Sequence, residues 1–453
     1  MTVHITRSPF HFLLSESFLK DCWVREVFPK DHKLIHVLED GTTPEDFTAA
    51  TIKEREATGC QDPFFVGSLN RLLENHRRWQ VNMPRVTPFY AVKCNPSPVM
   101  VRMLSLLGTG FDCASKGEIA MVLSHGATPD KIIFAHTTKA RTHIQYAYSR
   151  GVDLMTFDSE DELEKISVLF PKARLVLRIA VDDTYSIVKL NDKFGAKMRA
   201  VPNLLKTAKD LNLNVVGVSF HVGVLCGDSS CFTKAIANSR EVFNIAATMG
   251  FKMKLLDLGG GYDGKDHSKM NLEQCALVIN KCLDQHFPPE SGVRIIAEPG
   301  GFFAQSTFSL TTNITARRVV TDENNQKLIN YYINEGRFGS FSLLVNHPGF
   351  LELDPQLHRS VDDNEPKYRS VIWGPTCDSV DKVLDETMLP ESKAEDWIHF
   401  GNMGSYSIAL QCDFNGFKRT PIYYVVSVKN VQKLAALLKE ATAKSDKCIV
   451  LHG

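Results

Sequence analysis

Short apolar, β-rich runs alternate with segments of helical pattern along the middle of the chain, and this alternation constrains the fold more than any other feature. Between residues 88 and 300 there are eight such runs: FYAVK, GFDCA, IIFAH, LMTFD, LVLRIA, VVGVSFHV, LLDLGG and RIIAEP. The intervening segments mostly space their apolar residues as helices do; residues 160–170 place Leu163, Ile166 and Leu169 opposite a charged side. Eight strand–helix units are the number in a parallel (β/α)8 barrel, so we predict an α/β fold of this type. A doubly wound open sheet is the alternative that the same pattern allows.

The pattern changes on both sides of this region. After residue 305 come strand-like runs without long helices, FSLTTNITARRVV, YYINEGRF, SVIWGP, DWIHF and PIYYVVSV, which predict an antiparallel β domain. The tail KLAALLKEATAKSDK has the spacing of an amphipathic helix. We therefore predict an N-terminal segment at 1–60 that packs with the β domain, a barrel at 61–305, and a β domain with a C-terminal helix at 306–453.

Composition argues against several classes of function. The 52 basic and 52 acidic side chains cancel, so no excess field attracts nucleic acid or an anionic membrane. No run reaches the roughly 18 to 20 apolar residues of a bilayer span, and the N-terminus lacks the apolar core of a signal peptide. The 11 cysteines are an odd number without CxxC pairs or Cys/His metal spacing. We expect a cytoplasmic protein that binds no metal.

Polar residues gather at the carboxyl ends of the predicted strands, which is where a barrel of this kind has its active site. They are Lys93, Asp112, His136, Arg178, His221, Gly259–Gly261 and Glu298. Each has a structural alternative when taken singly: Lys93 as a surface lysine, His221 as a hydrogen-bonded interior histidine, the glycines as an ordinary turn. His136 is more simply a histidine at the rim. The coincidence of the others at one mouth favours a functional site.

This set of residue types suits one cofactor. A lysine forms a Schiff base with an aldehyde, and a nearby carboxylate adjusts its reactivity. The N–H groups of a glycine turn can cradle a phosphate. A carboxylate that faces a ring nitrogen keeps that nitrogen protonated. Aldehyde, phosphate and ring nitrogen together describe pyridoxal phosphate, and we predict that Glu298 controls its electron-accepting ring.

The order and spacing of several motifs are similar to those of the eukaryotic ornithine decarboxylase family, which includes the antizyme inhibitors. The motifs are FYAVKCN, GTGFDCASKGE, LVLRIA, KFGA, GVSFHVG, LLDLGGGY, RIIAEPG, WGPTCDSVD and NMGSY. The resemblance implies an alanine-racemase-like barrel plus β domain, arranged as a head-to-tail homodimer with active sites shared across the interface. It also implies the pyridoxal phosphate-dependent decarboxylation of an L-amino acid.

The resemblance implies roles for individual residues around the cofactor. Lys93 resembles the Schiff-base lysine, and Asp112 its ion-pair partner. Glu298 resembles the acid at the ring nitrogen, with Arg178 as its supporting arginine and His221 stacked on the ring. The cofactor phosphate is expected to be held by backbone groups and one tyrosine, namely Gly259, Gly260, Gly261, Gly300, Gly301 and Tyr406.

Other implied site residues come from the β domain. Cys377 and Asp378 resemble residues that enter from the neighbouring subunit, where the thiol reprotonates the substrate carbon and the carboxylate meets the far end of the substrate. Phe414 resembles an aromatic residue that lines this pocket. Residues 193–195 correspond to a mobile loop near the active site. The expected catalytic residues are Lys93, Cys377, Asp378, His221 and Glu298.

The chain departs from the family at the cofactor phosphate. The family's HVGSG reads HVGVL here, so Val224 stands where a hydroxyl would meet the phosphate, and EPGR reads EPGG, so Gly301 replaces an arginine. A lost charge-assisted contact typically costs about 1.5 to 3 kcal/mol. We therefore predict unusually weak binding of pyridoxal phosphate.

A second departure lies where the substrate side chain ends. The family's Tyr-Asp pair after GVYGSF aligns in GRFGSFSLLVNHPGF with Val345 and Asn346, or with Asn346 and His347, so neither alignment supplies a carboxylate. A desolvated cation needs a counter-charge. With Leu343 or Leu344, Val345 and Phe414 nearby, we favour a neutral aliphatic, leucine-like substrate. The retained Asp378 leaves an ornithine or lysine decarboxylase of polyamine biosynthesis as an alternative.

A further alternative is a catalytically weak, antizyme inhibitor-like regulator. The two phosphate-contact replacements favour it, whereas the retained lysine, acids and thiol favour an enzyme. Residues 139–174 correspond to the region where family members meet antizyme, and RTHIQYAYSRG is only partly similar. Antizyme binding is therefore doubtful.

Overall fold

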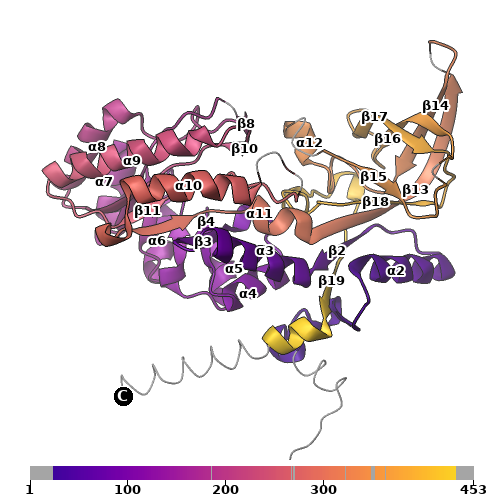
Figure 1. Ribbon diagram of the computed structural model, residues 1–453, viewed down its shortest axis with the longest axis horizontal. Helices are drawn as coiled ribbons and strands as arrows, with labels where there is room; N and C mark the ends of the chain where they lie inside the picture. The colour runs from indigo at the N-terminus through magenta and orange to yellow at the C-terminus, as the bar shows by residue number, and fades with distance from the viewer. Residues whose placement is uncertain are drawn as a thin grey trace, which may run out of the picture.

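Eight parallel strands close into a barrel in the computed structural model of the chain (Figure 1). In spatial order they are β11 (Leu255–Asp257), β12 (Arg294–Ala297), β3 (Val86–Ala91), β4 (Gly110–Cys113), β5 (Ile132–Phe134), β6 (Leu154–Phe157), β7 (Arg174–Arg178) and β9 (Asn214–Ser219). They coincide with the eight apolar runs of the sequence, so the predicted barrel is confirmed and the open-sheet alternative is wrong.

The structure describes residues 24–434 apart from 185, 267, 269, 270, 322, 348–351 and 363. The side chains of residues 225, 226, 345 and 346 also lie outside the described part. Residues 428–434 are helical, and the rest of the predicted C-terminal helix lies outside the described residues.

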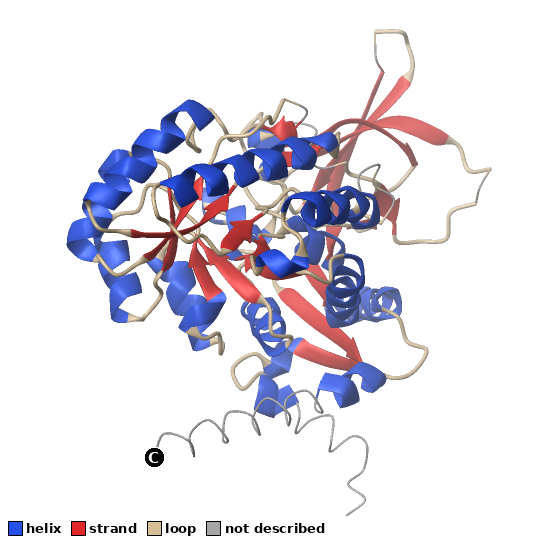
Figure 2. Ribbon diagram, turned by 60° about the vertical axis from the view of Figure 1, so that its left-hand side comes forward, coloured by secondary structure: helices blue, strands red, loops and turns tan. Residues whose placement is uncertain are grey.

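Helices cover the outside of the barrel strands (Figure 2). They are α3 (Leu69–Asn82), α4 (Pro98–Leu106), α5 (Lys116–Ser124), α6 (Arg141–Ser149), α7 (Glu160–Leu169), α8 (Val201–Asp210), α9 (Ser230–Thr248) and α10 (Leu272–His286). Several begin at a side chain that accepts a hydrogen bond from the first turn, as Ser115 does from Glu118 N and Ser159 from Glu162 N. Such caps fix where each helix starts after its strand.

Apolar side chains fill the interior of the barrel. One buried cluster joins six residues from six strands, Phe89, Ile133, Leu154, Val176, Leu255 and Ile296. The polar residues of the barrel strands therefore stand at the mouth above an apolar floor. A short antiparallel pair, β8 (Ser186–Val188) with β10 (Val224–Cys226), follows strands β7 and β9.

The second domain is a nine-stranded sheet that lies beside the barrel (Figure 1). Its main path is β1 (Ile35–Leu38), β19 (Ile422–Ser427), β2 (Phe64–Ser68), β13 (Phe308–Thr321), β14 (Lys327–Ile333), β16 (Lys367–Trp373) and β17 (Lys382–Pro390). The strands β15 (Pro355–Leu357) and β18 (Trp397–Phe400) pair beside β13. The sheet is mixed rather than antiparallel, because β19 pairs in parallel with β1 and β2, and β14 with β16.

The N-terminal part of the chain contributes to this sheet. Helix α2 (Pro44–Thr58) packs on it through Phe47 and Ile52, which join a buried cluster with Phe64 and Trp397. Strand β2 pairs with β13, so residues 64–68 belong to the sheet, whereas the expected barrel domain started at residue 61. The first barrel strand begins at Val86 because α3 must first cross from the sheet to the barrel.

None of the described helices has the length and apolar character needed to cross a membrane. Among the described residues, no group of three or more His, Cys, Asp and Glu side chains is arranged to hold a metal ion.

Candidate active site

The ends of the barrel strands bring most of the predicted cofactor residues to one pocket. Lys93 lies in the 3-10 turn that follows β3, His221 follows β9, and Glu298 follows β12. The predicted residues that line the pocket are Lys93, His221, Gly260, Gly261, Glu298, Gly300, Gly301 and Tyr406. Val224 also lines it, at the position where the family has a hydroxyl.

Lys93 and Asp112 form an ion pair at this mouth. Lys93 Nζ lies 2.6 Å from Asp112 Oδ2, and the Asp112 side chain is fully buried. Burial lowers the pKa of Lys93, but the nearby charges of Asp112 and Glu298 more than offset it and leave the pKa above its ordinary value. The second oxygen of Asp112 has no hydrogen-bond partner among the described residues. The pair therefore holds the lysine as an ammonium until a ligand changes its surroundings.

Glu298 has a carboxylic partner that the sequence analysis missed. Asp257, at the end of β11, is fully buried, and its carboxyl group interacts with that of Glu298. Burial raises the pKa of Asp257 to about 7. Burial, followed by the charge of Asp257, raises the pKa of Glu298 well above its usual range. The titrations of the two buried acids are linked, so the pair can hold a proton near neutral pH. The sequence could have identified Asp257 as a site residue, because it is an acid at the last position of a barrel strand.

His221 is neutral and has a fixed tautomer. Burial, together with the charges of Arg178 and Lys93, lowers the pKa of its imidazole well below the ordinary value. Its Nδ1 accepts a hydrogen bond from Gly223 N at 3.1 Å, which places the ring proton on Nε2. A flat neutral ring at this position can stack on an aromatic ligand.

Glycine residues without side chains line the pocket around His221 and Glu298. A Cβ atom at Gly260 would lie 2.8 Å from His221 Nε2, and one at Gly300 would lie 2.8 Å from the Cβ of Cys94. Larger residues are therefore excluded at these two positions. At Gly301 the nearest atom to an added Cβ would be 3.4 Å away, so the backbone there would accept the arginine of the family.

Tyr406 is held in the same pocket by its backbone. Its N–H donates to Cys94 O at 2.9 Å, and its φ of 54° is in the left-handed region that side chains rarely adopt. Such strain persists only where the surroundings fix it, and it is common at ligand sites.

Arg178 contacts the loop over the mouth rather than Glu298. Its guanidinium carbon lies 5.1 Å from the centre of the Phe194 ring, and Phe194 also packs edge-on against His136 at 5.8 Å. The loop is fixed by Gly195 N, which donates to Asp158 Oδ2 at 2.7 Å. The electrostatic effect of Arg178 reaches His221 and Asp257, so it acts on the acid pair from a distance.

The predicted residues of the β domain do not line the pocket with Lys93. Cys377 is exposed, Asp378 is half-buried, and Phe414 is 40% exposed and stacks on Phe338. Phe414 lines a separate cavity between the loops at 334–339 and 411–421. Within one chain, therefore, the two halves of the predicted site are apart.

Asp381 shapes the loop that carries Cys377 and Asp378. Its buried carboxylate accepts hydrogen bonds from Arg337 N at 2.6 Å and from Thr376 N and Oγ1 at 2.9 and 2.7 Å. The loop is thus held in a fixed shape at the surface.

The predicted substrate residues on α12 (Leu343–Asn346) are partly described. His347 is half-buried directly after this helix, and its N–H donates to Leu343 O at 2.9 Å. Asn346 has a described backbone, but its side chain lies outside the described part. His347 does not line the pocket with Lys93.

The residues of the pocket fit pyridoxal phosphate at its aldehyde and ring. Lys93 can take the aldehyde, Glu298 can face the ring nitrogen with Asp257 buried behind the pocket lining, and His221 and the glycine backbone leave room for a flat ring. The phosphate end offers backbone N–H groups and Tyr406, with Val224 in place of a hydroxyl donor.

Comparisons with known proteins agree with this geometry. The family described as "Pyridoxal-dependent decarboxylase, pyridoxal binding domain" matches residues 69–305. Ornithine decarboxylase of Rattus norvegicus is 45% identical over 410 residues, which are 88% of each chain. Antizyme inhibitor 2 of Xenopus laevis is 44% identical over 426 residues, 91% of this chain and 92% of its own.

A solved structure shows the same architecture. The arginine decarboxylase of Paramecium bursaria Chlorella virus superposes with a TM-score of 0.78 at 37% identity, covering 83% of this chain and all of that one. The chain therefore belongs to the ornithine decarboxylase family and is a pyridoxal phosphate-dependent amino-acid decarboxylase.

Proposed function

We propose that the substrate is an L-amino acid with a neutral aliphatic side chain, of leucine-like size, rather than ornithine. The observation that carries this proposal is the absence of an acid from FSLLVNH, residues 341–347, where the family has an aspartate. A cationic side chain brought out of water without a counter-charge is unfavourable by several kcal/mol. Leu343 and Leu344 are both buried and give this segment an apolar character.

Each residue of the barrel mouth has a separate role in the proposed reaction. Pyridoxal phosphate supplies an aldehyde and an electron-accepting ring when bound. Lys93 would take the aldehyde, and Asp112, at 2.6 Å from its Nζ, balances the charge of its ammonium. Glu298, with Asp257 behind it, would keep a proton at the ring nitrogen, and the neutral His221 would stack on the ring.

We further propose a homodimer in which each mouth is completed by the partner's β domain. The support is that Cys377 and Asp378 stand at the surface of the β domain, away from the pocket with Lys93. Apolar side chains near them are also exposed, among them Phe414 at 40% and Phe417 at 43%. In the dimer the Cys377 thiol would return a proton to the substrate carbon, and Asp378 would face the far end of the substrate.

A cytoplasmic location agrees with the state of the thiols. None of the eight cysteines that the structure describes with their side chains forms a disulfide with another of them, and six of these eight are buried or half-buried. Such thiols suit a reducing compartment.

The experiment that tests the substrate is release of labelled CO₂ from leucine, valine, ornithine, lysine and arginine, with excess pyridoxal phosphate and Lys93→Ala as the control. We expect release from leucine to exceed release from ornithine. Greater release from ornithine or lysine would show that Asp378 alone balances the side-chain cation. No release from any of them, with tight binding of antizyme, would establish the regulatory alternative.

A further inference from the structure

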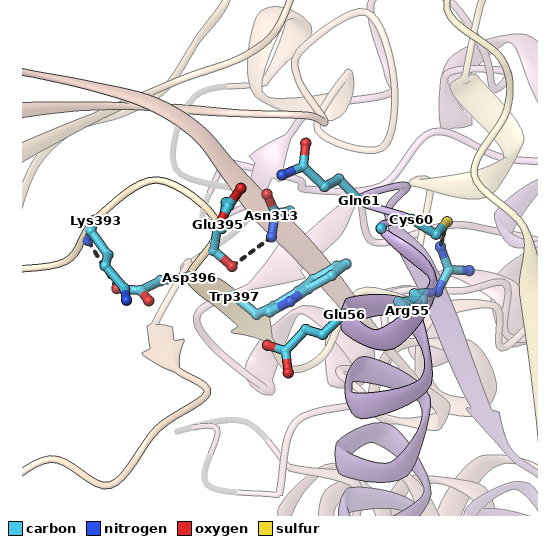
Figure 3. A pocket seen from close by; sticks show the side chains of 10 residues that line it. Arg55, Glu56, Cys60, Gln61, Asn313, Lys393, Glu395, Asp396 and Trp397 are labelled. Carbon is cyan, nitrogen blue, oxygen red and sulfur yellow. Dashed lines mark hydrogen bonds between the residues drawn. The ribbon is translucent and has the colours of Figure 1, made fainter.

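A second cavity, of about 360 Å³, lies in the β domain (Figure 3). One wall is the end of α2 and the turn after it, with Arg55, Glu56 and Gln61, and the other is the loop before β18, with Lys393 and Glu395. Its size is within the range of small-molecule sites. None of its lining residues belongs to the pocket with Lys93.

Two buried polar atoms of this cavity's lining residues lack partners. Trp397 is 3% exposed and Asn313 is 1% exposed, and both line the cavity. Trp397 Nε1 and Asn313 Oδ1 have no hydrogen-bond partner among the described residues, although Asn313 Nδ2 donates to Glu395 O at 2.9 Å. Buried polar groups are nearly always paired, so these two, one donor and one acceptor, indicate a missing partner of matching polarity.

Charged groups of both signs around the cavity are also without ionic partners. Three carboxylates line it, on Glu56, Glu395 and Asp396, and none forms an ion pair within 4.0 Å among the described residues. The Arg55 guanidinium, 8% exposed, donates to Asp62 O at 2.8 Å, to Cys60 Sγ and to Tyr423 Oη at 3.3 Å, and it forms no ion pair with a described carboxylate. Figure 3 shows Trp397 between the helix with Arg55 and the loop with Glu395.

The backbone of this loop is strained where it presents its carboxylate. Glu395 has a φ of 77°, a left-handed conformation that costs free energy for any residue with a Cβ atom. Its N–H donates to Ile314 O at 2.7 Å, which fixes it in place. Glycine would adopt this conformation without strain, so the strain at a glutamate is consistent with a role for its side chain.

From these observations we propose that the cavity binds a free α-amino acid as a second, non-catalytic ligand. A carboxylate would pair with Trp397 Nε1 and Arg55, and an ammonium would pair with Asn313 Oδ1 and the carboxylate of Glu395. A ligand whose only polar group is a carboxylate, or only an ammonium, satisfies just one of the two orphan atoms.

Calorimetric titration of the borohydride-reduced holoenzyme, whose active site is blocked, tests this proposal independently of the catalysed reaction. The probes are L-leucine, 3-methylbutylamine, which lacks the carboxylate, and 4-methylpentanoate, which lacks the ammonium. We expect L-leucine to bind at least about tenfold more tightly than either analogue, as loss of a charge-assisted hydrogen bond implies.

Two variants assign the binding to this cavity. Glu395→Gly should raise Tm, because it relieves the left-handed strain, and weaken L-leucine binding by at least about tenfold. Asn402→Gly is the matched control, since Asn402 has a φ of 56° in an exposed turn outside the cavity lining; it should leave binding unchanged. Trp397→Phe should weaken binding of L-leucine but not of 3-methylbutylamine.

Equal affinity for all three probes, or full affinity in Glu395→Gly, would overturn the proposal. So would the absence of any saturable heat, which would mean that ordered water alone satisfies Trp397 and Asn313.

Discussion

Lys93 Nζ lies 2.6 Å from Asp112 Oδ2, with the aspartate fully buried and the lysine 42% exposed on its side chain. The buried partner of the pair sets the charge of the accessible one. Lys93 is therefore held at the rim by an acid from the next strand, and the chemistry of the mouth depends on this contact.

Replacing Asp112 with asparagine should lower the pKa of Lys93. The partial desolvation of the ammonium by its surroundings would remain, but the largest opposing charge would be gone. The pH dependence of reductive methylation at Lys93 in the apo chain, followed by mass spectrometry, measures this pKa. Asp210→Asn, which removes the exposed partner of Lys206, is the control and should leave Lys93 unchanged. An unaltered Lys93 pKa in Asp112→Asn would show that Asp112 does not set its charge.

The stability of the apo chain should fall between about pH 4 and pH 7 because of Asp257, whose pKa is raised to about 7. In this window the folded state holds a proton that the unfolded state, with a carboxyl pKa of about 3.9, has already lost. Each step up in pH therefore favours the unfolded state. Asp257→Asn should flatten this dependence by an amount of the order of a few kcal/mol. Urea unfolding at pH 5 and pH 8 measures the change in the free energy of unfolding between these pH values. An equal change in the wild-type protein and in Asp257→Asn would contradict the assignment of this dependence to Asp257.

Pyridoxal phosphate should bind more tightly once its missing phosphate contacts are restored. Gly301→Arg should improve affinity about tenfold to a hundredfold, because the backbone there accepts a Cβ and a charge-assisted contact is gained. Val224→Ser should add a smaller gain. Gly301→Ala is the matched control for the backbone change. Equilibrium titration followed by absorbance measures the affinity, and a Gly301→Arg value no better than that of Gly301→Ala would refute the phosphate argument.

Mixing two inactive variants should restore activity if the active site is shared between subunits. Lys93→Ala lacks the barrel half of the site, and Cys377→Ala lacks the proton donor of the β-domain half. Random reassociation of equal amounts gives one intact site in half of the dimers, or about a quarter of wild-type activity. Activity no greater than the mean of the two variants would contradict the shared site.

The sequence was sufficient to predict the barrel, because each of its strands is a short apolar run ended by a polar residue or glycine. The contact of Lys93 with Asp112 was implied by the family resemblance, and the structure places the two residues at the ends of adjacent strands. The mixed sheet could not be predicted, because β1 and β19 pair residues 35–38 with residues 424–427, and no local pattern reports such distant pairing.

Asp257 was missed for a different reason. In LLDLGG it is one polar residue of a buried strand. Only the pairing of β11 with β12 in the structure shows that Asp257 interacts with Glu298. The sequence likewise did not show that Cys377 and Asp378 lie away from the pocket with Lys93. A motif identifies the residues, but it does not show which pocket they line.

The most direct test of the account is the site of attachment of the cofactor. The purified chain is incubated with excess pyridoxal phosphate, reduced with borohydride, digested and mapped by mass spectrometry. We predict a phosphopyridoxyl group on Lys93, absent from Lys93→Ala. A chain that carries no adduct at Lys93 at saturating cofactor would contradict the enzyme assignment.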